Sequence, residues 1–124
     1  MATQALSLTL KMVTNDNVSG IFKLNTNIDS DINFDNTEVE SKTMSIPTSA
    51  TEIIATTAAD TYIFIQNTEP TGGNFITVQD VANNTYAKLF PGNFLFLCCD
   101  GGEGLELISD TAACVVNYAK FKKV

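Results

Sequence analysis

The sequence predicts an all-β fold, a β-sandwich or jelly roll of about eight to ten short antiparallel strands. Apolar and polar residues alternate with a period of two in short runs rich in β-branched and aromatic residues. Asn, Asp, Gly, Thr and Pro separate these runs at short intervals. No segment has the apolar spacing of a long helix. We expect one domain over residues 1–124, with N-terminal strands and an arm in 1–46 and the sandwich core in 47–124.

The first predicted strand spans residues 5–12, where apolar positions alternate with polar ones: Leu6, Leu8, Leu10 and Met12. A turn at Asn15–Asn17 leads to a second run at Ile21–Leu24. A polar stretch, Asn25–Asn36, then connects to a strand at Thr37–Ile46, whose charges are typical of a sheet edge. Pro47 ends that strand because it cannot donate to a ladder.

Seven further strands follow, each bounded by turn residues. They are expected at Glu52–Ala55, Thr61–Asn67, Phe75–Asp80, Tyr86–Phe90, Asn93–Cys98, Leu105–Ser109 and Ala112–Lys120. The separating turns include Glu69–Gly73, Asn83-Asn84, Pro91-Gly92 and Asp100–Gly102.

Several strands in the second half are apolar on both faces. Phe94, Phe96 and Cys98 alternate with Leu95, Leu97 and Cys99, and Tyr62 and Phe64 alternate with Ile63 and Ile65. One explanation is a central strand covered by a second sheet on one side and by a loop or short helix on the other. The other is that the second face packs on a neighbouring subunit. In that case the subunit contact includes Leu95, Leu97, Cys99, Ile63 and Ile65.

Composition argues against several classes of function. The chain has no histidine, which excludes Ser-His-Asp and Cys-His catalysis, so we expect neither an enzyme nor a cofactor. Seven lysines and no arginine stand against fourteen carboxylates, giving a net charge of −7 that disfavours nucleic acid and anionic membranes as partners. The apolar run at 95–99 is far too short for a membrane helix. Charged residues make up 17% of the chain, which indicates surface buried against other molecules.

One acidic segment has oxygen ligands at the spacing of a calcium loop. The candidate ligands are Asp29, Asp31, Asn33, Asp35 and Glu40. The match is imperfect, because Phe34 stands where such loops require Gly and no helix flanks the segment. In an extended conformation the same residues would instead line one solvated face.

The C-terminus gathers three of the seven lysines: Lys120, Lys122 and Lys123. These residues are either a solubilising tail or a docking site for an acidic partner. The three cysteines are an odd number, and we expect them to be reduced and packed in the fold. Residues Met1–Gln4 lack the basic start of a signal peptide, which predicts a cytosol-like compartment.

Residues 52–119 carry a recurrent pattern of strands and turns. A strand ends in Asn at Tyr62–Asn67, the turn Leu89–Phe94 reads L-x-P-G-x-F, and the last strand enters through D-T-A at Asp110–Ala112. This pattern resembles small virion proteins of tailed bacteriophages, among them capsid decoration (cement) proteins.

The resemblance implies a β-sandwich or jelly-roll protein, often a homotrimer, that binds the major capsid protein and stabilises the assembled head. It implies a location on the capsid surface after synthesis in the host bacterial cytoplasm, and an N-terminal strand, Ala5–Met12, that reaches a neighbouring subunit. Two alternatives stay open. One is another virion component, such as a head-tail adaptor, tail or fibre module, and the other is a carbohydrate-binding module. The second has few candidate stacking residues: Tyr62, Tyr86 and Tyr118.

Overall fold

The computed structural model describes residues 3–13 and 25–124. In these ranges the chain forms nine strands and no helix, and the strand pairs are antiparallel. The strands are β1 (Thr3–Val13), β2 (Asn25–Ile46), β3 (Thr51–Ile54), β4 (Thr61–Asn67), β5 (Ile76–Gln79), β6 (Thr85–Leu89), β7 (Phe94–Cys99), β8 (Leu105–Ser109) and β9 (Cys114–Lys123). The predicted all-β class is confirmed.

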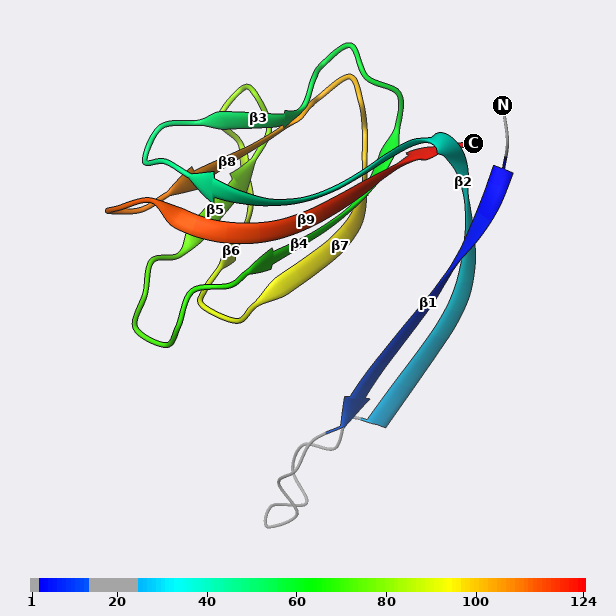
Figure 1. The fold of residues 1–124 in the computed structure, drawn as a ribbon, viewed down its shortest axis with the longest axis horizontal. Coiled ribbons are helices and arrows are strands. Elements are labelled where there is room, and N and C mark those ends of the chain that lie inside the picture. The colour runs from blue at the N-terminus through cyan, green and yellow to red at the C-terminus, as the bar shows by residue number, and fades with distance from the viewer. Residues whose placement is uncertain (1–2, 14–24) are drawn as a thin grey trace.

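The strands form two layers (Figure 1). One sheet has the order β1-β2-β9-β4-β7 and the other has the order β3-β8-β5-β6. From β2 to β9, every connection except β5–β6 passes from one sheet to the other. Apart from β1–β2 and β5–β6, neighbours in each sheet are therefore not consecutive in sequence. This arrangement of two four-stranded layers is a jelly roll, with β1 added at one edge.

The N-terminal part of the chain projects from the sandwich as a two-stranded ribbon (Figure 1). β2 pairs with β1 from Asn25 to Asp35 and with β9 from Phe34 to Ile46, with an irregularity between Phe34 and Val39. The expectation that Asn25–Asn36 is a polar connection is wrong, because the ladder with β1 holds these residues in a strand despite their low β propensity. The predicted turn at Asn15–Asn17 and the run Ile21–Leu24 lie outside the described residues.

From Val39 to Ile46, β2 pairs on one side only, among the strands that the structure describes. This agrees with the edge position expected from its charges. Ile46 is fully buried and Met44 packs against the core. The sandwich therefore begins within β2, ahead of residue 47.

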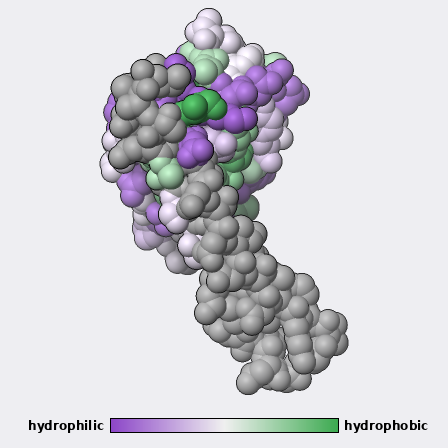
Figure 2. Space-filling view, turned by 90° about the vertical axis from the view of Figure 1, so that its right-hand side faces the viewer, coloured by the Kyte–Doolittle hydropathy of each residue, from purple (hydrophilic) through white to green (hydrophobic). Residues whose placement is uncertain are grey.

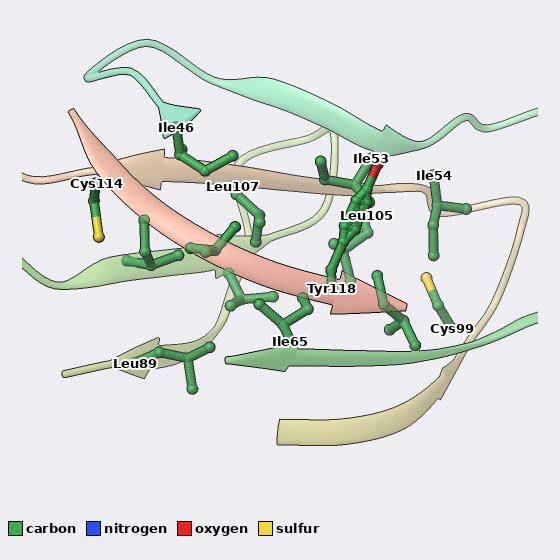
Figure 3. Packing of buried hydrophobic residues seen from close by; sticks show 14 residues of the cluster. Ile46, Ile53, Ile54, Ile65, Leu89, Cys99, Leu105, Leu107, Cys114 and Tyr118 are labelled. Atoms are coloured by element: carbon green, nitrogen blue, oxygen red, sulfur yellow. The ribbon is translucent and has the colours of Figure 1, made fainter. Parts of the chain in front are cut away.

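The core lies between the two sheets, and aliphatic side chains fill it (Figure 3). Alternation along β4 places Thr61, Ile63, Ile65 and Asn67 inside, while the intervening residues are half-buried on the other face. The buried apolar residues of this cluster are Ile46, Ile53, Ile54, Ile63, Ile65, Ile76, Val78, Leu89, Cys99, Leu105, Leu107, Cys114, Val116 and Tyr118.

A turn after β5 is organised by one carboxylate. Asp80 Oδ1 accepts hydrogen bonds from the backbone N–H groups of Ala82 (2.9 Å) and Asn84 (2.8 Å), and Asp80 Oδ2 accepts one from Asn84 Nδ2 (2.8 Å). Asn83 has a φ of 68°, a left-handed conformation that Asn tolerates. The hydrogen bonds from Asn84, side chain first, lower the pKa of Asp80.

Replacing Asp80 with Asn should therefore reduce the acid dependence of stability. The folded state favours the Asp80 carboxylate, so its contribution is complete above the ordinary Asp pKa and is lost as pH falls through the lowered pKa. Urea unfolding between about pH 6 and about pH 2 should show that wild type and Asp80→Asn converge at the acid end. Asp110→Asn, at an exposed carboxylate with no side-chain hydrogen bond recorded among the described residues, is the control. A difference between wild type and Asp80→Asn that stays constant with pH would contradict this account.

Candidate functional site

The outer surface of the five-stranded sheet carries an aromatic face, which we define as Tyr62, Phe64, Phe94 and Phe96. In β4 and β7, Tyr62 pairs with Cys98, Phe64 with Phe96, and Gln66 with Phe94. The rings of Tyr62 and Phe96 stack with centroids 6.0 Å apart, and those of Phe64 and Phe94 lie 6.1 Å apart. Phe94 is 53% exposed, and the other three rings are half-buried. Within the described residues, neither a helix nor a third layer covers this face.

The aromatic face ends at an open strand edge. β7 is the last strand of its sheet and pairs with β4 alone. Its sequence, FLFLCC, contains no charged residue, Pro or Gly. A hydrophobic edge strand of this kind presents unpaired N–H and C=O groups to any chain that approaches.

Uncharged residues continue from this edge across the neighbouring strands. Val115, Asn117 and Ala119 of β9 face outward beside β4, and Val115 is 39% exposed. A shallow hollow of about 310 Å³ reaches from β2, where Lys42 lines it, across β9 to Phe64. The strands β4 and β7 themselves contain no charged residue, although the chain as a whole carries a net charge of −7.

The three cysteines have different environments. Cys98 is exposed beside Tyr62, whereas Cys99 and Cys114 are buried. Burial raises the pKa of Cys99, and it raises the pKa of Cys114 to about 11. All three are free, and Cys98 lies at the surface instead of in the packed interior expected from the sequence.

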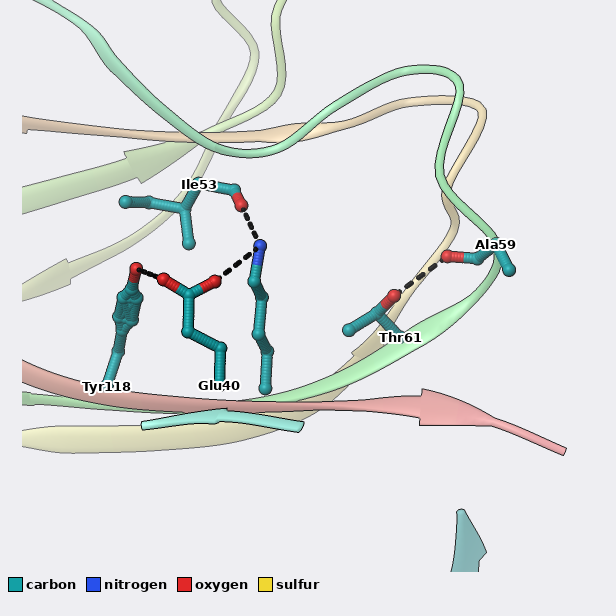
Figure 4. Close-up of polar contacts among 6 residues, drawn as sticks. Glu40, Ile53, Ala59, Thr61 and Tyr118 are labelled. Atoms are coloured by element: carbon teal, nitrogen blue, oxygen red, sulfur yellow. Dashed lines mark hydrogen bonds and ion pairs between the residues drawn. The ribbon is translucent and has the colours of Figure 1, made fainter. Parts of the chain in front are cut away.

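A polar network closes one end of the sandwich (Figure 4). Tyr118 Oη donates to Glu40 Oε1 (2.7 Å), and Lys120 Nζ lies 3.2 Å from Glu40 Oε2 and donates to the Ile53 carbonyl oxygen (2.8 Å). The hydrogen bond from Tyr118, followed by that from Lys120, lowers the pKa of Glu40. Burial, followed by the hydrogen bond to Glu40, raises the pKa of Tyr118 to about 12. At neutral pH neither group is poised to exchange a proton, so the network joins β2 and β9 to β3 and does not resemble an acid-base pair.

An open cavity of about 550 Å³ lies beside this network. It is lined by Val39, Glu40, Ile54, Ala55, Thr57, Ala58, Ala59, Thr61, Lys120 and Lys122. Figure 2 looks onto this end of the molecule, where hydrophilic residues predominate among those coloured and a few hydrophobic ones lie between them. Glu40 and Lys120 already pair with each other, which leaves the cavity without a converging set of chemical groups.

The interface residues expected from the sequence lie mainly on the inner face. Ile63 and Ile65 are fully buried, Cys99 is 4% exposed, and Leu95 and Leu97 pack against the core. These five side chains face the second sheet, and the opposite side of the same strands faces outward. Sequence alternation identified both faces, but it did not show which one points outward.

The acidic segment is extended within β2, and the side chains of Asp29 and Asp31 lie outside the described residues, so the candidate calcium site stays a prediction. Asp29, Asp31, Asn33 and Asp35 lie on β2, opposite Thr9, Ser7, Ala5 and Thr3 of β1. Glu40 lies beyond the β2 irregularity and binds Tyr118 and Lys120. Among the side chains that the structure describes, no group of three or more His, Cys, Asp or Glu residues could hold a metal ion.

The C-terminal lysines separate into different environments. Lys120 is paired with Glu40, Lys122 is half-buried, and Lys123 is exposed opposite Phe34 of β2. Tyr118 is 5% exposed and cannot stack on a sugar, whereas Tyr86 is 47% exposed. In the described part of the chain, no helix is long and apolar enough to span a membrane.

Comparison with known proteins gives a limited set of similarities. No family model matches the chain, and no curated protein matches it. A solved structure that is similar belongs to the Bacillus endospore appendages, described as forming "a novel family of disulfide-linked pili". The two chains share 12% identity over 70% of this chain and 87% of the other, with a TM-score of 0.44.

This finding overturns the expectation drawn from phage virion proteins. The structural similarity is to a pilus protein, so the assignment as a bacteriophage capsid decoration (cement) protein is wrong. The expected location on a capsid surface and the expected binding to a major capsid protein are withdrawn with it.

Proposed function

We propose that the chain is a structural subunit that self-associates into an ordered assembly and performs no catalysis. The observation that carries the proposal is the aromatic face, which reaches an uncharged edge strand without any covering layer in the described residues. Exposed apolar surface of this kind marks protein contacts. The proposal rests on this surface and not on the similarity to pili.

The projecting β1–β2 ribbon supports the same proposal. Isolated two-stranded ribbons are marginally stable in water and gain stability by packing on other elements. Over residues 25–33 the β2 strand pairs with β1 and has no partner on its other side among the described strands. An arm of this form supplies a second contact through which one subunit can reach another.

Sedimentation velocity of the purified chain from low to high micromolar concentration tests this function, with electron microscopy of the concentrated sample. We expect a mass that rises with concentration and discrete particles or filaments in the images. Association should strengthen with salt, because each copy carries a net charge of −7 and salt screens the repulsion. Docking of the lysine tail on an acidic partner would weaken with salt instead. A monomer at every concentration and salt condition would contradict the proposal.

A further inference from the structure

We infer that two copies of this chain join through their β7 strands, pairing antiparallel about a two-fold axis so that the aromatic faces form one continuous surface. The inference rests on the proposed self-association and specifies which surface performs it. It replaces the trimer implied by the phage resemblance with a two-fold pair.

Charge, length and ladder regularity distinguish β7 from the other exposed strand edges of the described chain. β2 carries Glu40 and Lys42 along its open edge, and β1 carries Lys11. β3 has four residues, including Glu52, and a register shift against β8. β6 carries Lys88, and its pairing with β5 also shifts. Charges, short length and bulges are the features that protect an edge from pairing with other chains, and β7 has no charge and no shift in its ladder with β4.

A second copy of the chain fits the β7 edge better than a charged partner does. The edge of β7 and the adjacent outer surface of β4 are uncharged, so they offer no complement to a charged partner. A second copy brings the same uncharged strip, and its pairing keeps the carboxylates of the two chains away from the contact. The contact is then isologous, with one patch serving both subunits.

Strand geometry limits the registers in which two β7 strands can pair. In antiparallel pairing, directly opposite residues point to the same side of the sheet. The two aromatic faces therefore share a side when the two-fold axis lies between the two copies of Phe96 or between the two copies of Leu97. The first register places Phe94 opposite Cys98 of the second copy, and the second places Phe96 opposite that cysteine. Both registers pair five of the six β7 residues.

Placing a charge on the edge tests the inference. Cys98 is exposed, so Cys98→Lys adds a protecting lysine to β7 without changing the core. We expect sedimentation to show that the Cys98→Lys dimer is weaker than the wild-type dimer, with a dissociation constant, Kd, raised by roughly tenfold or more. Val115→Lys places the same charge on the outer surface of β9, away from the edge, and should leave Kd nearly unchanged. Thermal melts at low concentration identify any variant that is merely unfolded.

Cross-linking provides a second, positional measurement. In the first register, the new thiol of Phe96→Cys faces the same thiol of the second copy, and in the second register it faces Cys98 of that copy. The oxidant diamide should therefore convert this variant to covalent dimers rapidly. Wild-type Cys98 does not face itself in either register and should cross-link slowly. Val115 is exposed on β9, away from the β7 edge, so Val115→Cys should also cross-link slowly.

The outcomes separate this inference from the proposed function. If the wild type associates and Cys98→Lys associates equally well, or if Val115→Cys cross-links as fast as Phe96→Cys, the β7 pairing is overturned while self-association stands. If the wild type remains a monomer, both are overturned. Weakening confined to Cys98→Lys, together with cross-linking confined to Phe96→Cys, supports both.

Discussion

Replacing Asn67 with Asp should lower the free energy of unfolding by about 3 kcal/mol, one of the largest effects of any single polar substitution in the chain. Asn67 is fully buried. Its Nδ2 donates to the carbonyl oxygens of Asn74 (2.9 Å) and Leu89 (2.8 Å). Its Oδ1 accepts from the backbone N–H of Glu69 (2.9 Å) and from the Cys114 thiol (3.3 Å). The side-chain amide thus ties together the β4–β5 loop, the end of β6 and the start of β9.

A carboxylate at this position would face two carbonyl oxygens with no proton to donate, and burial makes the unpaired charge costly. Urea denaturation and thermal melts measure the effect, and we expect Tm to fall by roughly 10 °C. Asn93→Asp is the matched control. Asn93 is exposed, and its Oδ1 accepts from the Phe90 N–H (3.2 Å), a role that a carboxylate retains. Equal losses in the two variants would show that Asn67 is not the hydrogen-bond centre described here.

Replacing Gly101 with Ala should cost about 3 kcal/mol or more, because the added methyl group has no space. Gly101 is buried in the β7–β8 turn, and its N–H donates to Asp60 Oδ1 (3.2 Å). A Cβ at this position would overlap the carbonyl group of Ala58 and lie 2.7 Å from the Ala59 oxygen. These are backbone atoms, so relief requires the β3–β4 loop to move.

The neighbouring glycine gives the control for this prediction. A Cβ on Gly102 would lie 3.2 Å from Asp100 Oδ1, which is a side-chain atom that can rotate away. Gly102→Ala should therefore change the free energy of unfolding by less than about 1 kcal/mol. Thermal melts of both variants test these two predictions. A Gly101→Ala protein as stable as Gly102→Ala would show that the β7–β8 turn and the β3–β4 loop are not in close contact.

Strand positions were predictable wherever local pattern and burial agree. Thr61–Asn67 and Leu105–Ser109 have the predicted bounds, because alternation coincides there with a buried face and turn residues mark both ends. Residues 25–36 were not predictable from local pattern. Their Asn and Asp residues favour turns, and only pairing with β1, which depends on the whole hairpin, makes them a strand.

The sequence identified the two strands that carry the candidate site, but it did not show which face of those strands points outward. Both sides of β4 and β7 are apolar, and a period of two does not show which side meets the second sheet. The residue types offered a usable signal. The inner positions Ile63 and Ile65 are aliphatic, whereas the outer positions Tyr62, Phe64 and Phe96 are aromatic.

The phage interpretation failed because its matching residues serve the fold. Asn67 is a buried hydrogen-bond centre, Gly92 has a φ of 84° that its turn requires, and Thr111 Oγ1 donates to Asn74 Oδ1 (2.6 Å). A jelly roll can use such residues in any setting, so they carry information about architecture and none about a capsid.

The continuous path of β2 has a mechanical consequence. One unbroken strand of 22 residues runs from the projecting ribbon into the sandwich, where its ladder with β9 reaches Ile46. Hydrogen bonds in such a ladder lie across the strand direction. Tension applied to the ribbon along β2 would therefore load many of them in shear at once instead of opening them one after another. A chain built in this way should resist a pulling force between its ribbon and its sandwich better than one whose strands separate in sequence.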